Sequence, residues 1–208
     1  MNSEEELKQV TQDVSTCTKC MLHNSRKLAV PGEGPYKAEI MFIGEGPGFY
    51  ENEQGRPFVG AAGKFLEELL AIVNMKRSEV FITNVVKCRP PGNRDPQSEE
   101  LAACSNYLER QIQAINPKVI VTLGRYSMAN FLPNAKISSV HGQAIKVKGR
   151  LVIAMYHPAA ALHQQSLKAT IEQDFARLPD LIAQATQMPE YIEKAPEEKI
   201  EPEQLSLF

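Results

Sequence analysis

Four short apolar segments constrain the fold of this chain most strongly, and they lie at residues 40–43, 80–86, 118–124 and 151–156. The first, Ile-Met-Phe-Ile, has no polar alternation, which is typical of a parallel strand covered on both faces. Each segment ends near a polar side chain and a turn that contains Gly or Pro. This repetition predicts an α/β fold with a doubly wound, mainly parallel, four-stranded sheet and a site along one edge.

Helical patterns occupy the chain around these strands. We expect helices at residues 3–15, 61–74, 97–115 and 166–185. In the first two, apolar residues recur at three- and four-residue spacings and form one buried stripe.

The chain has 208 residues, of which 43% are hydrophobic, so it is long enough for one domain with a real core. We expect this domain at residues 1–185, followed at 186–208 by a disordered acidic linker that ends in a short peptide. The formal charge is −2, but six Glu and two Lys follow residue 186, so the body carries +2. A mildly basic body is compatible with a phosphate-binding cleft without requiring one.

Nothing in the sequence resembles a signal peptide, and no apolar run approaches the roughly 20 residues that a membrane span needs. We therefore expect a cytoplasmic protein with no membrane partner. We also expect a monomer.

The four cysteines are placed as metal ligands are. Cys17 and Cys20 form a C-x-x-C turn, while 15 residues separate Cys88 from Cys104. In a reducing compartment, two disulfides are disfavoured. The spacing departs from the repeated C-x-x-C of zinc ribbons, and four thiolates also suit an iron–sulfur cluster. The spacing alone favours a metal or cluster over four unrelated thiols.

Three polar side chains follow strands and are functional candidates. Glu45 comes after the first strand, Asn84 lies near the end of the second, and His157 follows the fourth. The carboxyl ends of parallel strands share one edge of the sheet, where ligands collect. The alternatives are a solvated Glu in a turn, an Asn bonded to backbone and a structural His. An Asn that faces a ligand could recognise a pyrimidine edge by donating one hydrogen bond and accepting another.

Two loops add further candidates. Phe58, among small residues at 55–63, is either a core side chain or a flat platform for a planar ligand. The loop at 87–96 carries Lys87, Arg89 and Arg94, which could hold phosphates, although a solvated loop is the simpler interpretation.

Several motifs together resemble family 4 uracil-DNA glycosylases, and the resemblance covers about residues 10–185. The motifs are GEGPG at 44–48, GRPFVGAAG at 55–63, TNVVKCRPPGNRDP at 83–96, HPAA at 157–160 and the four cysteines. The resemblance implies a three-layer α/β/α fold, a [4Fe–4S] cluster held by Cys17, Cys20, Cys88 and Cys104, and excision of uracil from DNA.

The resemblance also implies roles for individual residues. Glu45 would stabilise the sugar cation and orient a water molecule, and His157 would stabilise the departing base. Phe58 matches the aromatic residue that stacks on uracil, and Asn84 matches the amide that recognises it. The remaining substrate contacts would be Gly46 in the first motif and Glu51, which lies where the family places a residue near uracil C5 and would exclude the methyl group of thymine.

Contacts to DNA are expected from Lys87, Arg89, Arg94 and Leu162. At Leu162 the chain departs from the family, because the sequence Ala-Leu-His-Gln follows HPAA where an arginine more usually follows the leucine. The loop around Asn93 lacks the Arg-rich, histidine-containing insertion of related proteins that bond covalently to uracil-DNA. This absence favours turnover.

The last five residues resemble the peptide by which bacterial repair proteins bind the sliding clamp. We expect partner contacts from Gln204, Leu205, Leu207 and Phe208. A DNA-binding module with a vestigial pocket is the alternative function for the whole chain. A nucleotide-phosphate enzyme built on GEGPG is disfavoured because no G-K-[ST] follows.

Overall fold

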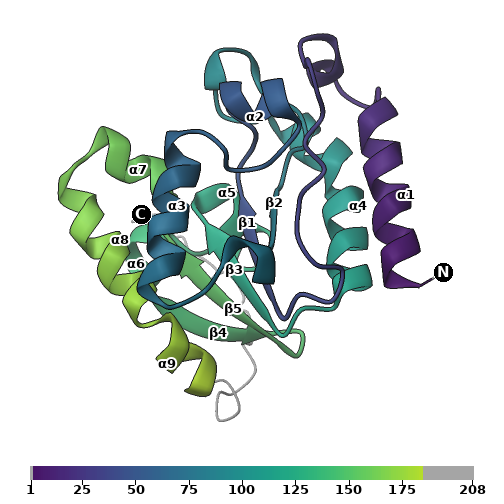
Figure 1. Cartoon of the computed structure of the whole chain (residues 1–208). Helices are drawn as coiled ribbons and strands as arrows, with labels where there is room; N and C mark the ends of the chain where they lie inside the picture. Colours follow the sequence, from purple (N-terminus) through teal and green to yellow (C-terminus); the bar gives the residue numbers. More distant parts are fainter. Residues whose placement is uncertain (1, 185–208) are drawn as a thin grey trace, which may run out of the picture.

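The computed structural model describes residues 2–184, and residues 1 and 185–208 lie outside the description. A five-stranded sheet in the order β2-β1-β3-β5-β4 forms its centre. Its strands are β1 (Ile40–Gly44), β2 (Phe81–Asn84), β3 (Val119–Leu123), β4 (Gln143–Val147) and β5 (Arg150–Met155). All pairs are parallel except β4 with β5 (Figure 1). The expected α/β class and mainly parallel sheet are therefore confirmed.

The prediction of four strands is wrong, because it left out β4. This edge strand is partly or fully exposed along its length, and its sequence QAIKV has no apolar run. Lys148 and Gly149 join β4 to β5, with φ angles of 50° and 76°. Two successive residues with positive φ make the tight turn whose twist matches that of paired strands.

Helices flank the sheet, and one face is covered by α3 (Ala61–Ile72), α7 (Pro158–His163), α8 (Ser166–Ala176) and α9 (Leu178–Ala183). On that face Phe42, Val121 and Ile153 pack in one core with Leu66 of α3 and Phe175 of α8. Successive residues of a strand point to opposite faces, so the neighbours of these side chains face the other helices.

The second face is covered by α4 (Ser98–Ile115), α5 (Arg125–Ala129) and α6 (Ile137–Val140). Here Met41 and Ile120 of the sheet pack against Leu108 of α4. The core on this face is separate from the core under α3.

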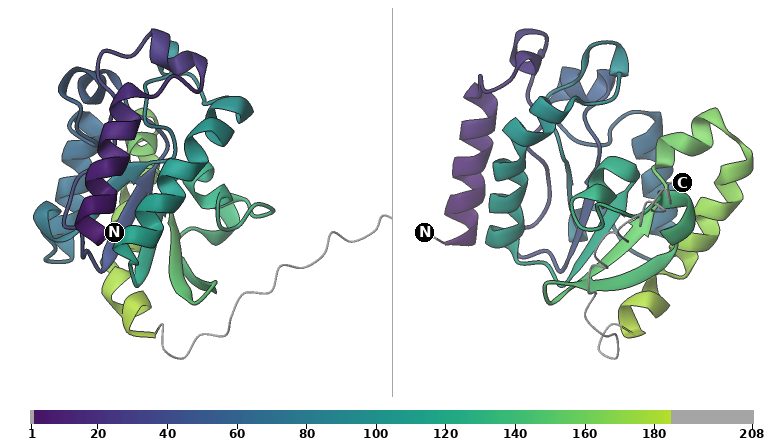
Figure 2. Two further views of the ribbon diagram at one scale, coloured as in Figure 1. Left: turned by 90° about the vertical axis from the view of Figure 1, so that its right-hand side faces the viewer. Right: turned by 180° about the vertical axis from the view of Figure 1, so that it is seen from behind.

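The N-terminal helix α1 (Ser3–Thr16) lies alongside α4 (Figure 2). Arg110 of α4 donates hydrogen bonds to Glu6 and Asp13 of α1, each at 2.6 Å. Because α1 ends directly before Cys17, this docking places the C-x-x-C turn beside α4.

The helix predicted at 166–185 is two helices within the described residues. α8 ends at Ala176 and α9 begins at Leu178. Pro179 has no N–H group to donate to the carbonyl of Phe175, so a continuous helix is interrupted here.

Short helical elements occur in the loops between these helices and strands. They are α2 (Phe49–Gln54) and three 3₁₀ turns, η1 (Met21–Asn24), η2 (Arg77–Glu79) and η3 (Pro91–Asn93). No helix within residues 2–184 combines the length and apolar character needed to cross a bilayer. The linker and terminal peptide expected at 186–208 lie outside the described residues.

Candidate active site

A cleft of about 560 Å³ opens at the carboxyl ends of β1, β2 and β5. Glu45, Phe58, Asn84 and His157 all line it, so one cavity brings together an acid, an aromatic ring, an amide and an imidazole. The other predicted site residues in its wall are Gly46, Glu51, Arg94 and Leu162. Parallel strand order explains this convergence, because it collects the loops that follow the strands at one edge.

Glu45 leaves the end of β1 as a partly buried carboxylate. Burial raises its pKa above the ordinary value, the negative charge of Asp95 raises the pKa further, and the positive charge of Arg125 opposes both. Asp95 also lines the cleft and forms an ion pair with Arg125. Next to Glu45, a Cβ atom on Gly46 would lie 2.7 Å from Cγ2 of Val86. Glycine at position 46 therefore lets the chain pass close to the segment that follows β2.

Phe58 is buried and is held by its backbone in an unusual conformation. Its φ angle is 50°, which bulky residues rarely adopt. Arg77 donates hydrogen bonds to the carbonyl of Phe58, at 3.0 Å, and to the carbonyl of Pro57. A Cβ atom on Gly63 would lie 2.0 Å from the Phe58 carbonyl oxygen, so α3 begins in close contact with this turn.

Asn84 closes the cleft at the end of β2. It is 1% exposed, and its Oδ1 atom has no hydrogen-bond partner within residues 2–184. A Cβ atom on Gly44 would lie 2.4 Å from that oxygen and 2.6 Å from the ring of Phe58. Any side chain at position 44 would therefore clash with the amide of Asn84 and the ring of Phe58.

His157 is the N-cap of α7, and its Nδ1 atom accepts a hydrogen bond of 3.1 Å from the Ala159 N–H. Burial lowers its pKa to about 4, with a smaller opposing effect from the charge of Glu51. The ring is therefore neutral near pH 7. Because Nδ1 is an acceptor, the proton lies on Nε2, which is then a hydrogen-bond donor.

Glu51 is 8% exposed, and its Oε1 atom accepts hydrogen bonds of 2.9 Å from the N–H groups of both Val59 and Gly60. Gly60 is the N-cap of α3, so the carboxylate occupies the positive end of that helix. These bonds fix α2 to α3 and hold Glu51 in the wall of the cleft.

The expectation that Lys87 contacts DNA is contradicted by its position. The side chain is 1% exposed, and Nζ donates to Thr83 Oγ1, the Asn84 carbonyl and Gln111 Oε1, each at 2.7 Å. Burial lowers its pKa to about 7. An ammonium group enclosed by three internal acceptors is out of reach of a phosphate, and Lys87 instead supports the backbone of Asn84.

The other predicted DNA contacts are closer to solvent. Leu162 is 54% exposed on α7. Arg89 donates through Nε to Asn93 Oδ1 at 2.7 Å, and its guanidinium lies 5.3 Å from the ring centroid of Phe49. Arg94 makes a two-pronged ion pair with buried Glu100, at 2.9 and 2.7 Å, which anchors the loop to α4 and compensates the charge of Arg94.

The chain matches the model of the Uracil DNA glycosylase superfamily over residues 31–178. It is 49% identical over 185 residues to the type-4 uracil-DNA glycosylase of Sulfurisphaera tokodaii, covering 84% of both chains. It is 47% identical over 187 residues to that of Archaeoglobus fulgidus, covering 85% of this chain and 94% of the relative. For Thermotoga maritima the identity is 43% over 188 residues, with 88% and 98% covered.

The chain belongs to the type-4 uracil-DNA glycosylases. It is a uracil-DNA glycosylase of base excision repair, and the cleft described above is the cavity in which its candidate catalytic residues meet.

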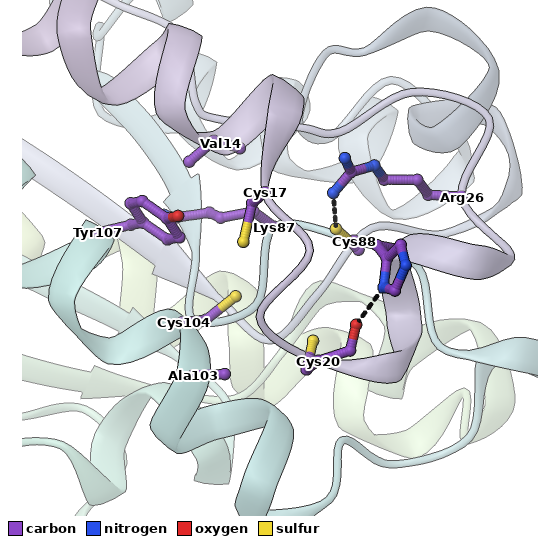
Figure 3. A pocket seen from close by; sticks show the side chains of 10 residues that line it. Val14, Cys17, Cys20, Arg26, Lys87, Cys88, Ala103, Cys104 and Tyr107 are labelled. Atoms are coloured by element: carbon purple, nitrogen blue, oxygen red, sulfur yellow. Dashed lines mark hydrogen bonds between the residues drawn. The ribbon is translucent and has the colours of Figure 1, made fainter.

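The four cysteines of this type-4 uracil-DNA glycosylase line a second, smaller cavity (Figure 3). Cys17 and Cys20 lie between α1 and η1, Cys88 follows β2, and Cys104 is on α4. Within residues 2–184, no three His, Cys, Asp or Glu side chains are close enough to hold one metal ion.

Two N–H groups point at these sulfur atoms. Arg26 donates to Cys88 Sγ at 3.3 Å, and the backbone N–H of Lys19 donates to Cys17 Sγ at 3.5 Å. Such bonds stabilise negative charge on sulfur.

Sequence reasoning missed two features of the uracil-DNA glycosylase site. The charges of Asp95 and Arg125 shift the pKa of Glu45 in opposite directions, and Arg125 could have been found because it follows the third predicted strand directly. Phe49 and Tyr50 also line the cleft, and no periodic pattern marks them.

Proposed function

We propose that this glycosylase flips uracil out of DNA into the cleft, hydrolyses the N-glycosidic bond and leaves an abasic site. The observation that carries the proposal is the Oδ1 atom of Asn84, which has no hydrogen-bond partner in the part of the chain that the structure describes. A buried acceptor without a donor is costly. The N3–H group of uracil would supply that donor, while the amide Nδ2 donates to uracil O4.

The same two contacts separate uracil from cytosine. Cytosine has an acceptor at N3 and a donor at N4, so both contacts would pair like with like against Asn84. Stacking on the buried ring of Phe58 would add affinity for either base, and it would offset the few kcal/mol that flipping a nucleotide costs.

His157 would stabilise the departing base. When the glycosidic bond breaks, negative charge develops on uracil and reaches O2. A neutral imidazole that donates from Nε2 is suited to this oxygen, and its orientation is set in advance by the Ala159 N–H on Nδ1. A preorganised donor of this kind is typically worth about 2.7–4 kcal/mol.

Glu45 would stabilise the positive charge that develops on the sugar and would orient the water that attacks C1′. The carboxylate form is the one required for both tasks. Its partly buried position strengthens the electrostatic interaction. Burial and the charge of Asp95 raise the pKa of Glu45, and the positive charge of Arg125 offsets part of that rise.

Glu51 and Gly46 would set the shape of the base site. The carboxylate of Glu51 is fixed by two backbone N–H groups, so it forms a rigid wall and would crowd a methyl group on C5 of thymine. Gly46, directly after Glu45, presents backbone without a side chain to the substrate.

Arg89 and Leu162 would contact the DNA around the flipped nucleotide. Arg89 places a cation at the rim, where phosphates position a duplex or single strand. The exposed Leu162 is suited to fill the space that the flipped base leaves. Arg94 lines the same cleft, but its pairing with Glu100 makes loop anchoring its main task.

The four cysteines would hold a [4Fe–4S] cluster. The thiols come from the C-x-x-C turn, the segment after β2 and α4, they line one cavity, and two N–H groups donate to them. This set of ligands is compatible with the cluster that the resemblance to type-4 uracil-DNA glycosylases implies. When bound, the cluster would link α1, the segment after β2 and α4. Its proposed task is structural, since the uracil cleft is lined by other residues.

We also propose that the terminal peptide, Gln204 to Phe208, binds a sliding clamp. This peptide lies outside the described residues, and its resemblance to clamp-binding peptides is the support.

An oligonucleotide with one labelled uracil tests the proposed reaction. The wild-type protein is expected to release free uracil and leave a site that breaks in alkali, and the Glu45→Gln and His157→Ala variants are expected to be at least about 100-fold slower. A DNA-binding module with a vestigial pocket would bind the oligonucleotide and leave it intact, which would overturn the proposal.

A further inference from the structure

Two large aromatic side chains stand exposed at the rim of the uracil cleft. Phe49 and Tyr50, the first residues of α2, are 51% and 58% exposed. Their rings pack edge to face, with centroids 5.5 Å apart and planes at 84°. Both line the same cavity as Glu45 and Asn84. They contribute little to the core, so their exposure needs another explanation.

The helix that carries them is firmly held. Glu51 bonds to the N-terminus of α3, as described above. Asn52 is 5% exposed, its Oδ1 atom accepts from the Lys27 N–H at 2.9 Å, and its carbonyl accepts from the Leu28 N–H at 3.1 Å. The two buried polar residues thus fix the backbone that carries the two exposed rings. A rigid aromatic pair binds a planar group without a large loss of conformational entropy.

A positive charge accompanies the pair. The guanidinium of Arg89 lies 5.3 Å from the Phe49 centroid, and Nε is its group engaged by Asn93. The guanidinium thus places a positive charge beside the ring of Phe49. Aromatic faces next to a cation are the combination that binds single-stranded nucleic acid, because bases stack on the rings and the phosphate meets the charge.

We propose that Phe49 and Tyr50 form a stacking site for the nucleobase next to uracil in the same strand. The inference rests on the proposed binding of uracil in the cleft, because continuity with that cleft puts the neighbouring nucleotide at the rim. In a duplex, that neighbour is stacked and paired within the helix. In a single strand it is free to move onto the rings, so the site favours single-stranded substrate.

Variants at position 50 separate stacking from other effects. Tyr50→Ala and Tyr50→Leu are expected to lower kcat/KM for a single-stranded uracil oligonucleotide by about tenfold, whereas Tyr50→Phe keeps most of it. The same variants are expected to change kcat/KM for a duplex by less than about threefold. The Phe49→Ala variant should behave as Tyr50→Ala does, to a smaller extent since Phe49 is the less exposed ring.

Tyr36→Ala is the matched control. Tyr36 is 43% exposed and precedes β1, at the opposite edge of the sheet from the cleft. This variant is expected to match the wild type on both substrates. Normal cleavage by this variant would show that loss of an exposed tyrosine elsewhere on the protein leaves the glycosylase reaction intact. A failure of the stacking proposal can then be told apart from a failure of the glycosylase reaction.

A fluorescent base gives a second readout that is independent of turnover. 2-Aminopurine is placed next to a uracil nucleotide that carries 2′-fluorine, which resists cleavage. Wild-type protein is expected to quench the fluorescence by stacking, and Tyr50→Leu is expected to leave it bright at saturating protein. Equal losses on single-stranded and duplex DNA, or equal quenching by wild type and Tyr50→Leu, would overturn the stacking site.

Discussion

The ring of Phe58 stacks against the imidazole of His157, with centroids 5.5 Å apart and planes at 25°. The first residue lies in the turn before α3 and the second in the turn after β5. The contact makes the flat wall of the base site and the proposed hydrogen-bond donor to uracil O2 parts of one packed unit. A change that tilts one ring therefore displaces the other.

Asn84→Ala is expected to lower kcat/KM for uracil-DNA by about 10- to 100-fold. The base would lose both polar contacts, and its N3–H and O4 groups would be left without partners. The thermal midpoint should stay within about 2 °C of the wild type, since the mutation removes an acceptor that no group within residues 2–184 satisfies. Single-turnover cleavage and thermal unfolding provide the two measurements. Comparable cleavage by variant and wild type would refute the role of Asn84.

The acid limb of the pH–rate profile should follow Glu45, whose pKa is raised by burial and by the charge of Asp95. Activity requires the carboxylate, so it falls as pH drops through that raised pKa. Asp95→Asn removes a negative charge and should move the limb to lower pH, while Arg125→Met removes a positive charge and should move it to higher pH. Asp180→Asn, on α9, is the control. A limb that stays in place in both the Asp95 and the Arg125 variant would exclude Glu45 as its source.

Arg77→Met should reduce kcat/KM by about tenfold or more, although Arg77 is not among the residues that line the cleft. The guanidinium holds the carbonyls of Pro57 and Phe58, and without it the stacking ring loses its fixed tilt. Steady-state kinetics on the single-uracil oligonucleotide measure the effect. Lys76→Met, the exposed neighbour, should retain activity, and an Arg77 variant as fast as this control would contradict the positioning role.

Cys88→Ala and Cys104→Ala should each abolish or greatly reduce the content of iron and acid-labile sulfide and remove the broad visible absorbance of a cluster. Unfolding should begin at a lower temperature, because α1 and α4 lose their shared support. Ser105→Ala, next to Cys104 on α4, should keep the full content. Wild-type protein that contains zinc and no sulfide would show that the ligands hold a different metal.

Leu207→Ala combined with Phe208→Ala should abolish binding to an immobilised bacterial sliding clamp, while cleavage of a short oligonucleotide stays unchanged. The apolar side chains of such a peptide supply its contacts with the clamp pocket. Ser206→Ala is the matched control. Retention of clamp binding by the double variant would remove the assignment.

Local sequence patterns predict most of the strands and the position of the site, and each success has a physical reason. Glu45, Asn84 and His157 could be placed together because parallel strands present their carboxyl ends at one edge. The strand at 143–147 was not predicted, because an edge strand needs no apolar run. The apolar spacing of Ile171, Phe175, Leu178 and Leu181 continues across the break at Pro179, so periodicity alone predicts one helix.

Lys87 shows what a local pattern leaves undetermined. A lysine in a loop rich in Arg and Pro is usually solvated, and its burial here depends on Thr83 and on Gln111, which comes from α4. The same holds for Glu51, whose bonds to Val59 and Gly60 exist because α2 and α3 meet. In both cases a partner from another structural element decides the burial, and the local pattern does not contain it.

The left-handed backbone of Phe58, fastened from behind by Arg77 and by the start of α3, has a consequence for fidelity. A ring on an ordinary loop could swing aside and accommodate an intruder at little expense. This ring is braced, so a larger or differently shaped base meets a surface that does not yield and bears the entire misfit itself. With Phe58 as the proposed base platform, discrimination would then be a matter of stiffness as much as of chemistry.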